Sequence, residues 1–266
     1  MTDQTYQLIA IGLYFLAMLG IGYYAYFQTT SLDDYMLAGR KLSPGVAALS
    51  AGASDMSGWL LMGLPGAIYV SGLVEAWIAI GLTIGAYLNW RFVAPRLRSY
   101  TEVSNNSITL PSFLESRFRD NTRLLRIASG LIILVFFTFY VSSGMVAGGV
   151  FFEASFGTHY LFGMLLVAGI TLTYTLFGGF LGASLTDVAQ GMLMFAALII
   201  IPVTTVFVLG GIDETIAAIN AADAAHNAAN PDNPLRRTSL LFGGSILALL
   251  SAASWGLGYF GQPHII

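Results

Sequence analysis

The sequence predicts an all-α, polytopic membrane protein with about seven transmembrane helices. Hydrophobic residues make up 56% of its 266 residues, charged residues only 9%, and the mean hydropathy is +0.74. Soluble domains carry roughly 25% charged residues, so this composition indicates an integral membrane protein. Apolar stretches of about 20 residues, the length that one helical crossing requires, recur along the chain.

Seven stretches meet this criterion, and the polar intervals between them separate one from the next. The N-terminal sequence MTDQTYQL has no basic region ahead of its apolar run, so we expect a retained helix and not a signal peptide. The interval before the fourth span contains LPSFLESRF, which predicts a short surface helix with a proline in its first turn. We expect a loop at 210–233. The predicted spans are residues 6–27, 48–72, 74–93, 125–152, 160–181, 188–209 and 235–266.

The second span combines polar and helix-breaking residues within one apolar stretch. A carboxylate in a spanning segment costs about 2.5–3.5 kcal/mol on insertion scales. Glycine and proline weaken the helix, and freed backbone groups are tolerated only inside protein or beside a cavity. We therefore expect a broken helix whose loose carbonyls face a cation. The residues concerned are Ser50, Ser54, Asp55 and Ser57, interleaved with Gly52, Gly58, Gly63, Pro65 and Gly66.

The basic residues predict the orientation of the chain in a cytoplasmic membrane. Of the 11 lysines and arginines, all but Arg236 and Arg237 lie in, or at the edges of, the intervals after the first and third spans. The positive-inside rule places those intervals in the cytoplasm. The N-terminus is then outside, and an odd number of spans puts the C-terminus inside.

The second and seventh spans share a similar sequence pattern. The sequence SAASWGLGYFGQPHII, like the second span, pairs serine and tryptophan with closely spaced glycines and then a proline. Two interrupted spans at corresponding positions indicate an inverted-repeat transporter with its binding site at the repeat interface. We expect an extra N-terminal helix and cytoplasmic loop at 1–44 and a first five-helix repeat at 45–211. An extracytoplasmic loop at 212–234 and the first helix of a truncated second repeat at 235–266 follow.

Two carboxylates are candidate ion ligands. Asp55 is either a cation or proton site or a structural acid bonded to a neighbouring helix; intramembrane acids favour the functional interpretation. Asp187 starts the predicted sixth span, so it either caps that helix or forms a second carboxylate on the cytoplasmic ion route. For Ser50 we favour helix packing, whereas Ser57, beside the predicted break, fits packing and a site equally. An oxygen-rich site of this kind suits a hard cation.

Three aromatic residues are candidates for lining a pocket. Trp255 and Tyr259 are four residues apart and would share one face of an α-helix. Tyr140 precedes Ser142, Ser143 and Gly144, which form a polar patch within the fourth span. The other interpretation for all three is a place in the core or toward lipid.

Several classes of function are excluded or disfavoured. The chain has no cysteine, which excludes disulfides and thiol nucleophiles, and its net charge of −3 gives no indication of nucleic acid as a partner. Its three histidines are far apart, and it has neither a phosphate-binding glycine loop nor a Gly-x-Ser-x-Gly elbow. An intramembrane protease would pair Asp55 with Asp187, but we expect these acids at different depths. The sequence therefore predicts a protein that is not an enzyme.

Five segments resemble the sodium/solute symporter family, and within it the bacterial proline symporters. They are SAGASDMSGWLLMGLPGA, LTIGAYLNW, FFTFYVSSG, GGFLGASLTDVAQ and WGLGYFGQPHI. The resemblance covers essentially the whole chain. It implies sodium-coupled uptake of L-proline by a five-plus-five inverted-repeat fold. Members of the family continue through further helices, which supply serine and threonine hydroxyls to the sodium site.

The resemblance also implies roles for individual residues. Backbone carbonyls near Ala53 and Met56 would hold sodium, with Asp55 essential close by and Asp187 serving its release to the cytoplasm. Arg40 matches a basic loop residue required for coupling. The residues that would lie around the proline are Ser57, Gly58, Tyr140, Trp255, Tyr259 and Pro263. Two alternatives stay open: an inactive truncated symporter fragment, or a solute-sensing membrane domain of the same fold.

Overall fold

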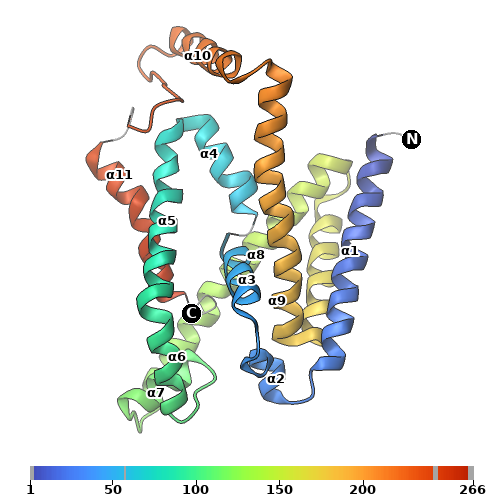
Figure 1. Cartoon of the computed structure of the whole chain (residues 1–266), viewed down its shortest axis with the longest axis vertical. Helices are drawn as coiled ribbons and strands as arrows, with labels where there is room; N and C mark the ends of the chain where they lie inside the picture. The colour runs from blue at the N-terminus through green and yellow to red at the C-terminus, as the bar shows by residue number, and fades with distance from the viewer. Residues whose placement is uncertain (1–2, 57, 242–244, 263–266) are drawn as a thin grey trace. The chain divides into compact units, whose positions relative to one another are not determined.

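The computed structural model describes residues 3–56, 58–241 and 245–262. Within these ranges all regular secondary structure is helical, which confirms the predicted all-α class (Figure 1). The α-helices are α1 (Asp3–Gln28), α2 (Leu32–Leu37), α3 (Pro44–Met56), α4 (Leu64–Ser71), α5 (Ala76–Leu88), α6 (Ala94–Val103), α7 (Leu110–Phe118), α8 (Leu124–Phe156), α9 (Tyr160–Leu209), α10 (Ile212–Ala229) and α11 (Ile246–Ala253). The 3-10 helices are η1 (Ala38–Arg40), η3 (Leu73–Glu75) and η5 (Ser254–Gly261), and the π-helices are η2 (Trp59–Gly63) and η4 (Asn89–Val93).

Four continuous helical stretches in the described part of the chain are long and apolar enough to cross a membrane. They are Asp3–Gln28, Leu73–Val103, Leu124–Phe156 and Tyr160–Leu209. Two shorter apolar helices, Trp59–Ser71 and Ile246–Gly261, fall within the predicted second and seventh spans. The fold is therefore that of an α-helical membrane protein.

The 50-residue helix α9 contains two helical segments that meet at Gly179. A straight α-helix of this length would extend about 75 Å, against about 30 Å for the hydrocarbon core of a bilayer. Gly179 has φ 59° and ψ −153°, a conformation that is essentially restricted to glycine. A Cβ placed on Gly182 would lie 3.4 Å from the carbonyl oxygen of Tyr174, although eight residues of straight helix would separate them by about 12 Å. The chain therefore reverses direction at Gly179, as Figure 1 shows, and the two helical segments 160–178 and 180–209 contain most of the stretches predicted as the fifth and sixth spans, 160–181 and 188–209.

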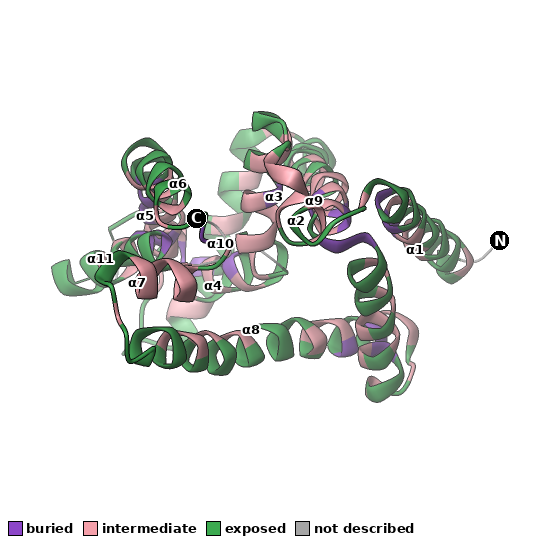
Figure 2. Cartoon of the chain, turned by 90° about the horizontal axis from the view of Figure 1, so that it is seen from below, coloured by how far each residue is buried: buried purple, intermediate pink, exposed green. Residues whose placement is uncertain are grey.

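The chain divides into two compact units, each of two segments. Unit 1 comprises Met1–Ser57 and Thr101–Gly191. In it α1 packs closely on the hairpin of α9, where a Cβ on Gly22 would lie 2.6 Å from the Cβ of Tyr174. Helix α8 is exposed along most of its length, and its buried residues, Gly149 and Phe152, lie toward its C-terminal end (Figure 2).

Unit 2 comprises Gly58–Tyr100 and Met192–Ile266. Its tightest packing joins α5 to α11 and η5. A Cβ on Gly81 would lie 2.1 Å from the Ala253 carbonyl oxygen, and a Cβ on Gly85 would lie 2.0 Å from that of Gly256. Four residues of α-helix and three residues of 3-10 helix both rise about 6 Å, which explains why the two contacts repeat in register. Backbone therefore packs directly on backbone here.

The interval 210–233, expected as a loop, contains the 18-residue helix α10. Alanine is the strongest helix former, and α10 is rich in it. Asp213 and Glu214 in its first turn complement the helix dipole. The predicted loop is thus wrong in its secondary structure, because local propensity was underestimated.

The seventh apolar segment also starts later than expected. Residues 235–241 are not helical; backbone amides of this stretch bond to α10, and the side chain of Arg237 bonds to α4. The Leu235 amide donates to Asn227 Oδ1 at 2.6 Å. Arg237 forms a 2.6 Å ion pair with Asp223, and its Nε donates to the Tyr69 carbonyl oxygen at 2.6 Å. The helical part of this segment begins at Ile246, and not near Leu235.

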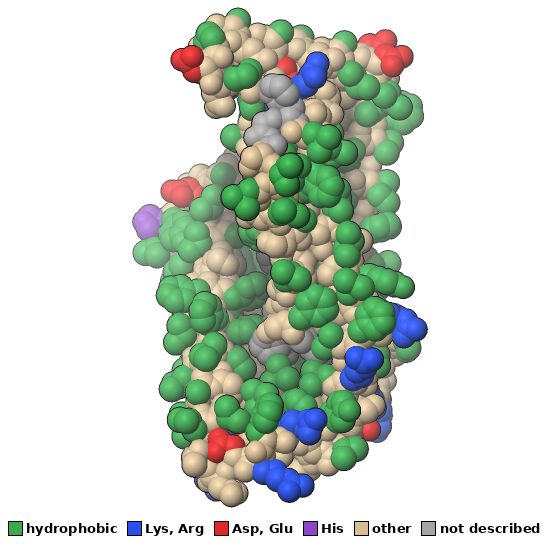
Figure 3. Space-filling view, turned by 90° about the vertical axis from the view of Figure 1, so that its left-hand side faces the viewer, with side chains coloured by type: hydrophobic (Ala, Val, Ile, Leu, Met, Phe, Trp, Pro, Cys, Tyr) green, Lys and Arg blue, Asp and Glu red, His purple; other side chains and the backbone are tan. Residues whose placement is uncertain are grey.

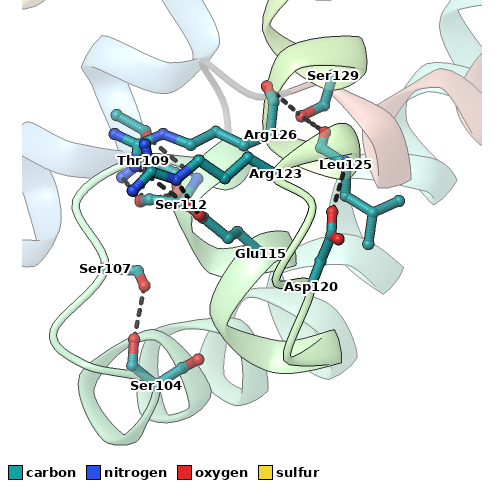
Figure 4. Close-up of polar contacts among 10 residues, drawn as sticks. All are labelled: Ser104, Ser107, Thr109, Ser112, Glu115, Asp120, Arg123, Leu125, Arg126 and Ser129. Atoms are coloured by element: carbon teal, nitrogen blue, oxygen red, sulfur yellow. Dashed lines mark hydrogen bonds and ion pairs between the residues drawn. The ribbon is translucent and has the colours of Figure 1, made fainter.

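The predicted surface helix in the interval before the fourth span is confirmed as α7. Thr109 caps it, in a capping box with Ser112, and a proline stands in its first turn. Glu115 then ties α7 to α8 through ion pairs with Arg126 at 3.1 Å and Arg123 at 3.8 Å (Figure 4). Unit 1 thus has a polar, ion-paired junction between these two helices.

Much of the exposed surface is apolar. Side chains such as Phe139, Phe207 and Val208 are between 71% and 85% exposed. Hydrophobic side chains also make up much of the face seen in Figure 3. Such a surface is unfavourable in water and is expected of helices in contact with lipid.

Candidate functional site

The last two turns of α3 and the carboxylate of Asp187 form the main polar cluster of unit 1. Ser50 and Ser54 both donate their hydroxyls to Asp187 Oδ2, at 2.8 and 2.7 Å. Because the serines are four residues apart, they lie on one face of α3, which faces the second segment of α9. Ser50 is buried and Ser54 and Asp187 are half-buried. This cluster joins the two regions of sequence that were expected to hold an ion.

Helix α8 completes this cluster from another direction. Its Tyr140 donates a hydrogen bond from the phenolic hydroxyl to the backbone carbonyl oxygen of Ser54. Ser54 is therefore contacted twice, at its side chain by α9 and at its backbone by α8. Tyr140 itself is 39% exposed, which leaves much of its ring accessible.

Two expectations for Asp187 are wrong. It lies eight residues beyond Gly179, more than two turns into the second segment of α9, so it does not cap that helix. The acids were also expected at different depths, yet Ser54, the neighbour of Asp55, contacts Asp187 directly. Both errors share one cause, because the sixth span begins at Gly179 and not at residue 188.

The other predicted cation ligands cluster at the end of α3. Ala53 packs beside Gly191, where a Cβ on the glycine would lie 3.3 Å from that of Ala53. Asp55 is half-buried, and Met56, the last residue of α3, is 38% exposed. Ser57 lies outside the described residues. Carbonyl, carboxylate and hydroxyl oxygens are thus concentrated here, and they are the ligands that a hard cation prefers.

Unit 2 contains the predicted aromatic residues of the seventh segment. Trp255 stacks on Trp59 of η2, with ring centroids 5.5 Å apart and an interplanar angle of 22°. Gly58, also assigned to the substrate site, directly precedes this π-helix and is exposed. The sequence pattern shared by the second and seventh segments thus corresponds to a direct contact between their tryptophans. Pro263 lies outside the described residues.

Trp255 and Tyr259 do not share a face, contrary to expectation. Trp255 is 52% exposed, whereas Tyr259 is 4% exposed. The expectation assumed an α-helix, but both residues lie in the 3-10 helix η5. With three residues per turn, positions four apart diverge by about 120°. Tyr259 therefore points into the core of unit 2 while Trp255 lies at its surface.

Arg40, the predicted coupling residue, lies in η1 of unit 1. Its Nη1 is 3.4 Å from Glu102 Oε1, and both side chains are partly exposed. Arg40 has φ 55°, and the adjacent Ala38 and Gly39 have φ 50° and 58°. This run of left-handed residues turns the chain sharply between α2 and α3. The ion pair links that turn to the C-terminal end of α6.

Two buried or partly buried polar residues, Gln190 and Asn89, were not predicted from the sequence as candidate functional residues. Gln190, one turn after Asp187, donates to the Tyr14 hydroxyl of α1 at 2.7 Å. Asn89, the first residue of η4, is fully buried, and its carboxamide has no hydrogen-bond partner among the described residues. The amide of Asn89 follows Gly81 and Gly85 at a four-residue spacing, a signal that was available in the sequence.

Comparisons with known proteins agree with the resemblance seen in the five segments. Residues 35–266 match the model of the sodium:solute symporter family. The chain is 58% identical over 249 residues to the high-affinity proline transporter PutP of Bacillus subtilis (strain 168), which covers 94% of this chain and 50% of that protein. It is 51% identical over 259 residues to the osmoregulated proline transporter OpuE of the same strain, covering 97% of this chain and 50% of that protein.

A third relative is the sodium/proline symporter of Staphylococcus aureus (strain JH9), 50% identical over 266 residues, or 99% of this chain and 49% of that protein. The chain thus spans about half the length of these curated relatives. The family match extends from α2 to the last residue and includes the Asp187 cluster, Arg40 and the stacked tryptophans. This chain belongs to the sodium:solute symporter family.

Proposed function

We propose that this chain takes part in sodium-coupled uptake of L-proline across the bacterial cytoplasmic membrane by alternating access. The observation that carries the proposal is the cluster of Ser50, Ser54 and Asp187 at the end of α3. It concentrates oxygen ligands among apolar helices, where an unpaired carboxylate would be costly. Relatives at 50–58% identity are named as proline transporters or sodium/proline symporters, which supports proline and sodium as the solutes.

The proposed cation site lies at the end of α3. Carbonyl oxygens of Ala53 and Met56 bind sodium, with the carboxylate of Asp55 beside them. Asp187 receives the ion on its way to the cytoplasm. The helix dipole supports this arrangement, because the C-terminal end of a helix carries partial negative charge.

The proposed proline site lies around the interrupted second and seventh segments. Ser57, Gly58 and Pro263 belong to it, and the exposed rings of Tyr140 and Trp255 contact the substrate, whereas Tyr259, which points into the core of unit 2, does not. Proline is a zwitterion, so helix ends with unpaired amides and carbonyls complement both of its charges. Arg40 couples sodium binding to movement of the cytoplasmic side.

The proposed architecture is the one expected from the sequence. About seven spans, with the second and seventh broken, form part of a five-plus-five inverted repeat, and the N-terminus is outside. The π-helix η2 and the proline at the start of α4 support an irregular second segment, and the 3-10 helix η5 supports an irregular seventh. Sodium entry then uses the membrane potential, which supplies about 2.3 kcal/mol per charge for each 100 mV.

Proline uptake by a chimera tests the proposal. In the chimera this chain replaces the matching half of the Bacillus subtilis high-affinity proline transporter. Proteoliposomes containing it are expected to accumulate radiolabelled proline under an inward sodium gradient and not under an equal potassium gradient. An Asp55→Asn chimera serves as the matched control and is expected to lose sodium-driven uptake. Uptake that is equal in sodium and potassium contradicts the coupling, and absence of uptake beside an active parent transporter contradicts the function.

A further inference from the structure

The hydroxyl of Tyr140 occupies a position that contact with a substrate ring does not explain. It donates to the backbone carbonyl oxygen of Ser54, two residues before α3 ends at Met56. The last four carbonyls of an α-helix have no partner within the helix. Tyr140 thus supplies, from α8, a side-chain donor to the last described turn of α3.

This bond acts on the same turn that carries the proposed cation ligands. The carbonyls of Ala53 and Met56 lie on either side of the Ser54 carbonyl in the sequence. A carbonyl oxygen has two lone pairs, so one hydrogen bond fixes its direction and leaves one lone pair available. On its other side Ser54 is held by the 2.7 Å bond from its hydroxyl to Asp187. The final turn of α3 is therefore fixed between α8 and α9.

We propose that Tyr140 is a positioning residue, which caps the C-terminal end of α3 and thereby sets the affinity of the cation site. This inference rests on the proposed sodium site at the end of α3. In this assignment the hydroxyl of Tyr140 acts on the cation site through the Ser54 carbonyl, and the exposed ring remains available to contact proline. The two roles are separable, because Tyr140→Phe removes the hydroxyl and keeps the ring.

Tyr35 offers a matched control for this substitution. Its hydroxyl also donates to a backbone carbonyl, that of Leu176, at 3.3 Å, and it lies in the same unit. Tyr35→Phe therefore removes a bond of the same kind from α2 and not from the end of α3. Any general effect of losing a tyrosine hydroxyl appears in both variants.

The test is hydrogen–deuterium exchange of the full-length chimera, titrated with sodium chloride while choline chloride keeps the ionic strength constant. Without sodium, amides of the last turn of α3 are expected to exchange about two- to tenfold faster in Tyr140→Phe than in the parent or Tyr35→Phe, the range for one lost hydrogen bond. Amides of α5 and α7 are expected to be unchanged, which excludes general unfolding.

The sodium titration then tests the link to the ion. We expect the concentration that gives half-maximal protection of this turn to rise about two- to tenfold in Tyr140→Phe and to stay unchanged in Tyr35→Phe. Half-saturating proline for uptake should change less than half-saturating sodium. Unchanged exchange in Tyr140→Phe overturns the cap, and an unchanged sodium midpoint, or no sodium protection in the parent, overturns its role in affinity. The sodium-free rates need no transport, so this failure is distinct from failure of uptake.

Discussion

At the scale of single residues, Asp187 shows how an acid is accommodated within an apolar helix. Its Oδ2 accepts hydrogen bonds from the hydroxyls of Ser50 and Ser54. The protein therefore solvates the carboxylate where water is scarce. Hydrogen bonds to a charged group contribute about 1.5–3 kcal/mol, more than those between neutral groups. The two serines therefore do more than allow helices to approach one another.

Replacing Ser54 by alanine is expected to lower the free energy of unfolding by about 1–3 kcal/mol, because Asp187 loses one charge-assisted hydrogen bond. In a double-mutant cycle, Ser54→Ala and Asp187→Asn should be non-additive by at least about 0.5 kcal/mol. Denaturant titration in detergent micelles measures both. Ser129→Ala is the control, since its hydroxyl donates to Leu125 of its own helix, and it should cost less than about 0.5 kcal/mol. Additive effects of the first two substitutions would contradict the cluster.

A second residue, Asp120, is expected to make stability depend on pH. The Thr122 hydroxyl, and then the Leu125 amide, hold the pKa of this carboxyl below its usual value. A group whose pKa is lowered in the folded state stabilises the fold above its unfolded pKa, about 3.9, and this contribution is lost as the pH falls through the folded value. Asp120→Asn should therefore destabilise the protein at pH 7 and converge with wild type below pH 4.

Thermal midpoints in detergent between pH 7 and pH 3 measure this convergence. Thr122→Val is the matched variant, because it removes the first cause of the shift and should raise the pKa of Asp120. Asp34, whose pKa is lowered chiefly by the Thr30 hydroxyl, is present in each protein and cancels in the comparison. A difference between Asp120→Asn and wild type that stays constant down to pH 3 would disprove the assignment.

At the scale of elements, the contact between α5 and η5 depends on the absence of side chains at Gly81 and Gly85. A Cβ at either position would lie 2.0–2.1 Å from a backbone carbonyl oxygen of the facing helix, so the backbones would have to separate. We expect Gly85→Ala to cost about 1–3 kcal/mol or more, the range for overpacked cores. Thermal unfolding in detergent measures the loss.

Gly66→Ala in α4 is the control for this substitution. No atom lies within 4 Å of its added Cβ, and alanine favours helix over glycine by up to about 1 kcal/mol. Gly66→Ala should therefore be neutral or stabilising. Equal losses for the two variants would show that helix propensity, and not the close approach, decides the effect.

The elements that were predicted correctly are those with a strong local signal. Long apolar runs identified α1, α8 and the two segments of α9, and a proline beside an amphipathic stretch identified α7. The reversal at Gly179 was expected too late in the chain, because the polar residues Ser184, Thr186 and Asp187 suggested that the interval between the spans lies at 182–187, and no proline marks the turn at Gly179. Helix α10 was missed because its asparagines and aspartates indicated a loop and the helix propensity of its alanines was underestimated.

The candidate site was predicted as a set of residues but not as a geometry. Asp187 and the serines of α3 were singled out separately, and only tertiary packing brings them within 2.8 Å. Placing Trp255 and Tyr259 on a face also required the number of residues per helical turn, which differs between an α-helix and a 3-10 helix. Glycines near Trp255 indicated an irregular segment, yet nothing in the pattern distinguished a 3-10 helix from an α-helix, so Tyr259 was assigned to the wrong face.

At the scale of the whole molecule, the path of the chain across the membrane depends on the reversal at Gly179. Residue 121, in the polar interval before α8, and residue 232, after α10, are both exposed. Between them lie α8 and the two segments of α9, which we expect to make three crossings. Three crossings place the two residues on opposite sides of the membrane, whereas a single unbroken α9 would place them on the same side.

Because the chain has no cysteine, single cysteines at these positions test this path without a background. In right-side-out spheroplasts a membrane-impermeant maleimide should label Asp232→Cys, and it should label Asn121→Cys only after permeabilisation. The arginines around residue 121 predict which of the two sides is cytoplasmic. Labelling of both variants from outside would show that α9 crosses once, and labelling of Asn121→Cys alone would reverse the orientation. Hydropathy counts apolar residues and does not show where a long apolar stretch turns. The glycine-restricted backbone at Gly179 therefore predicts two crossings where a straight helix would predict one.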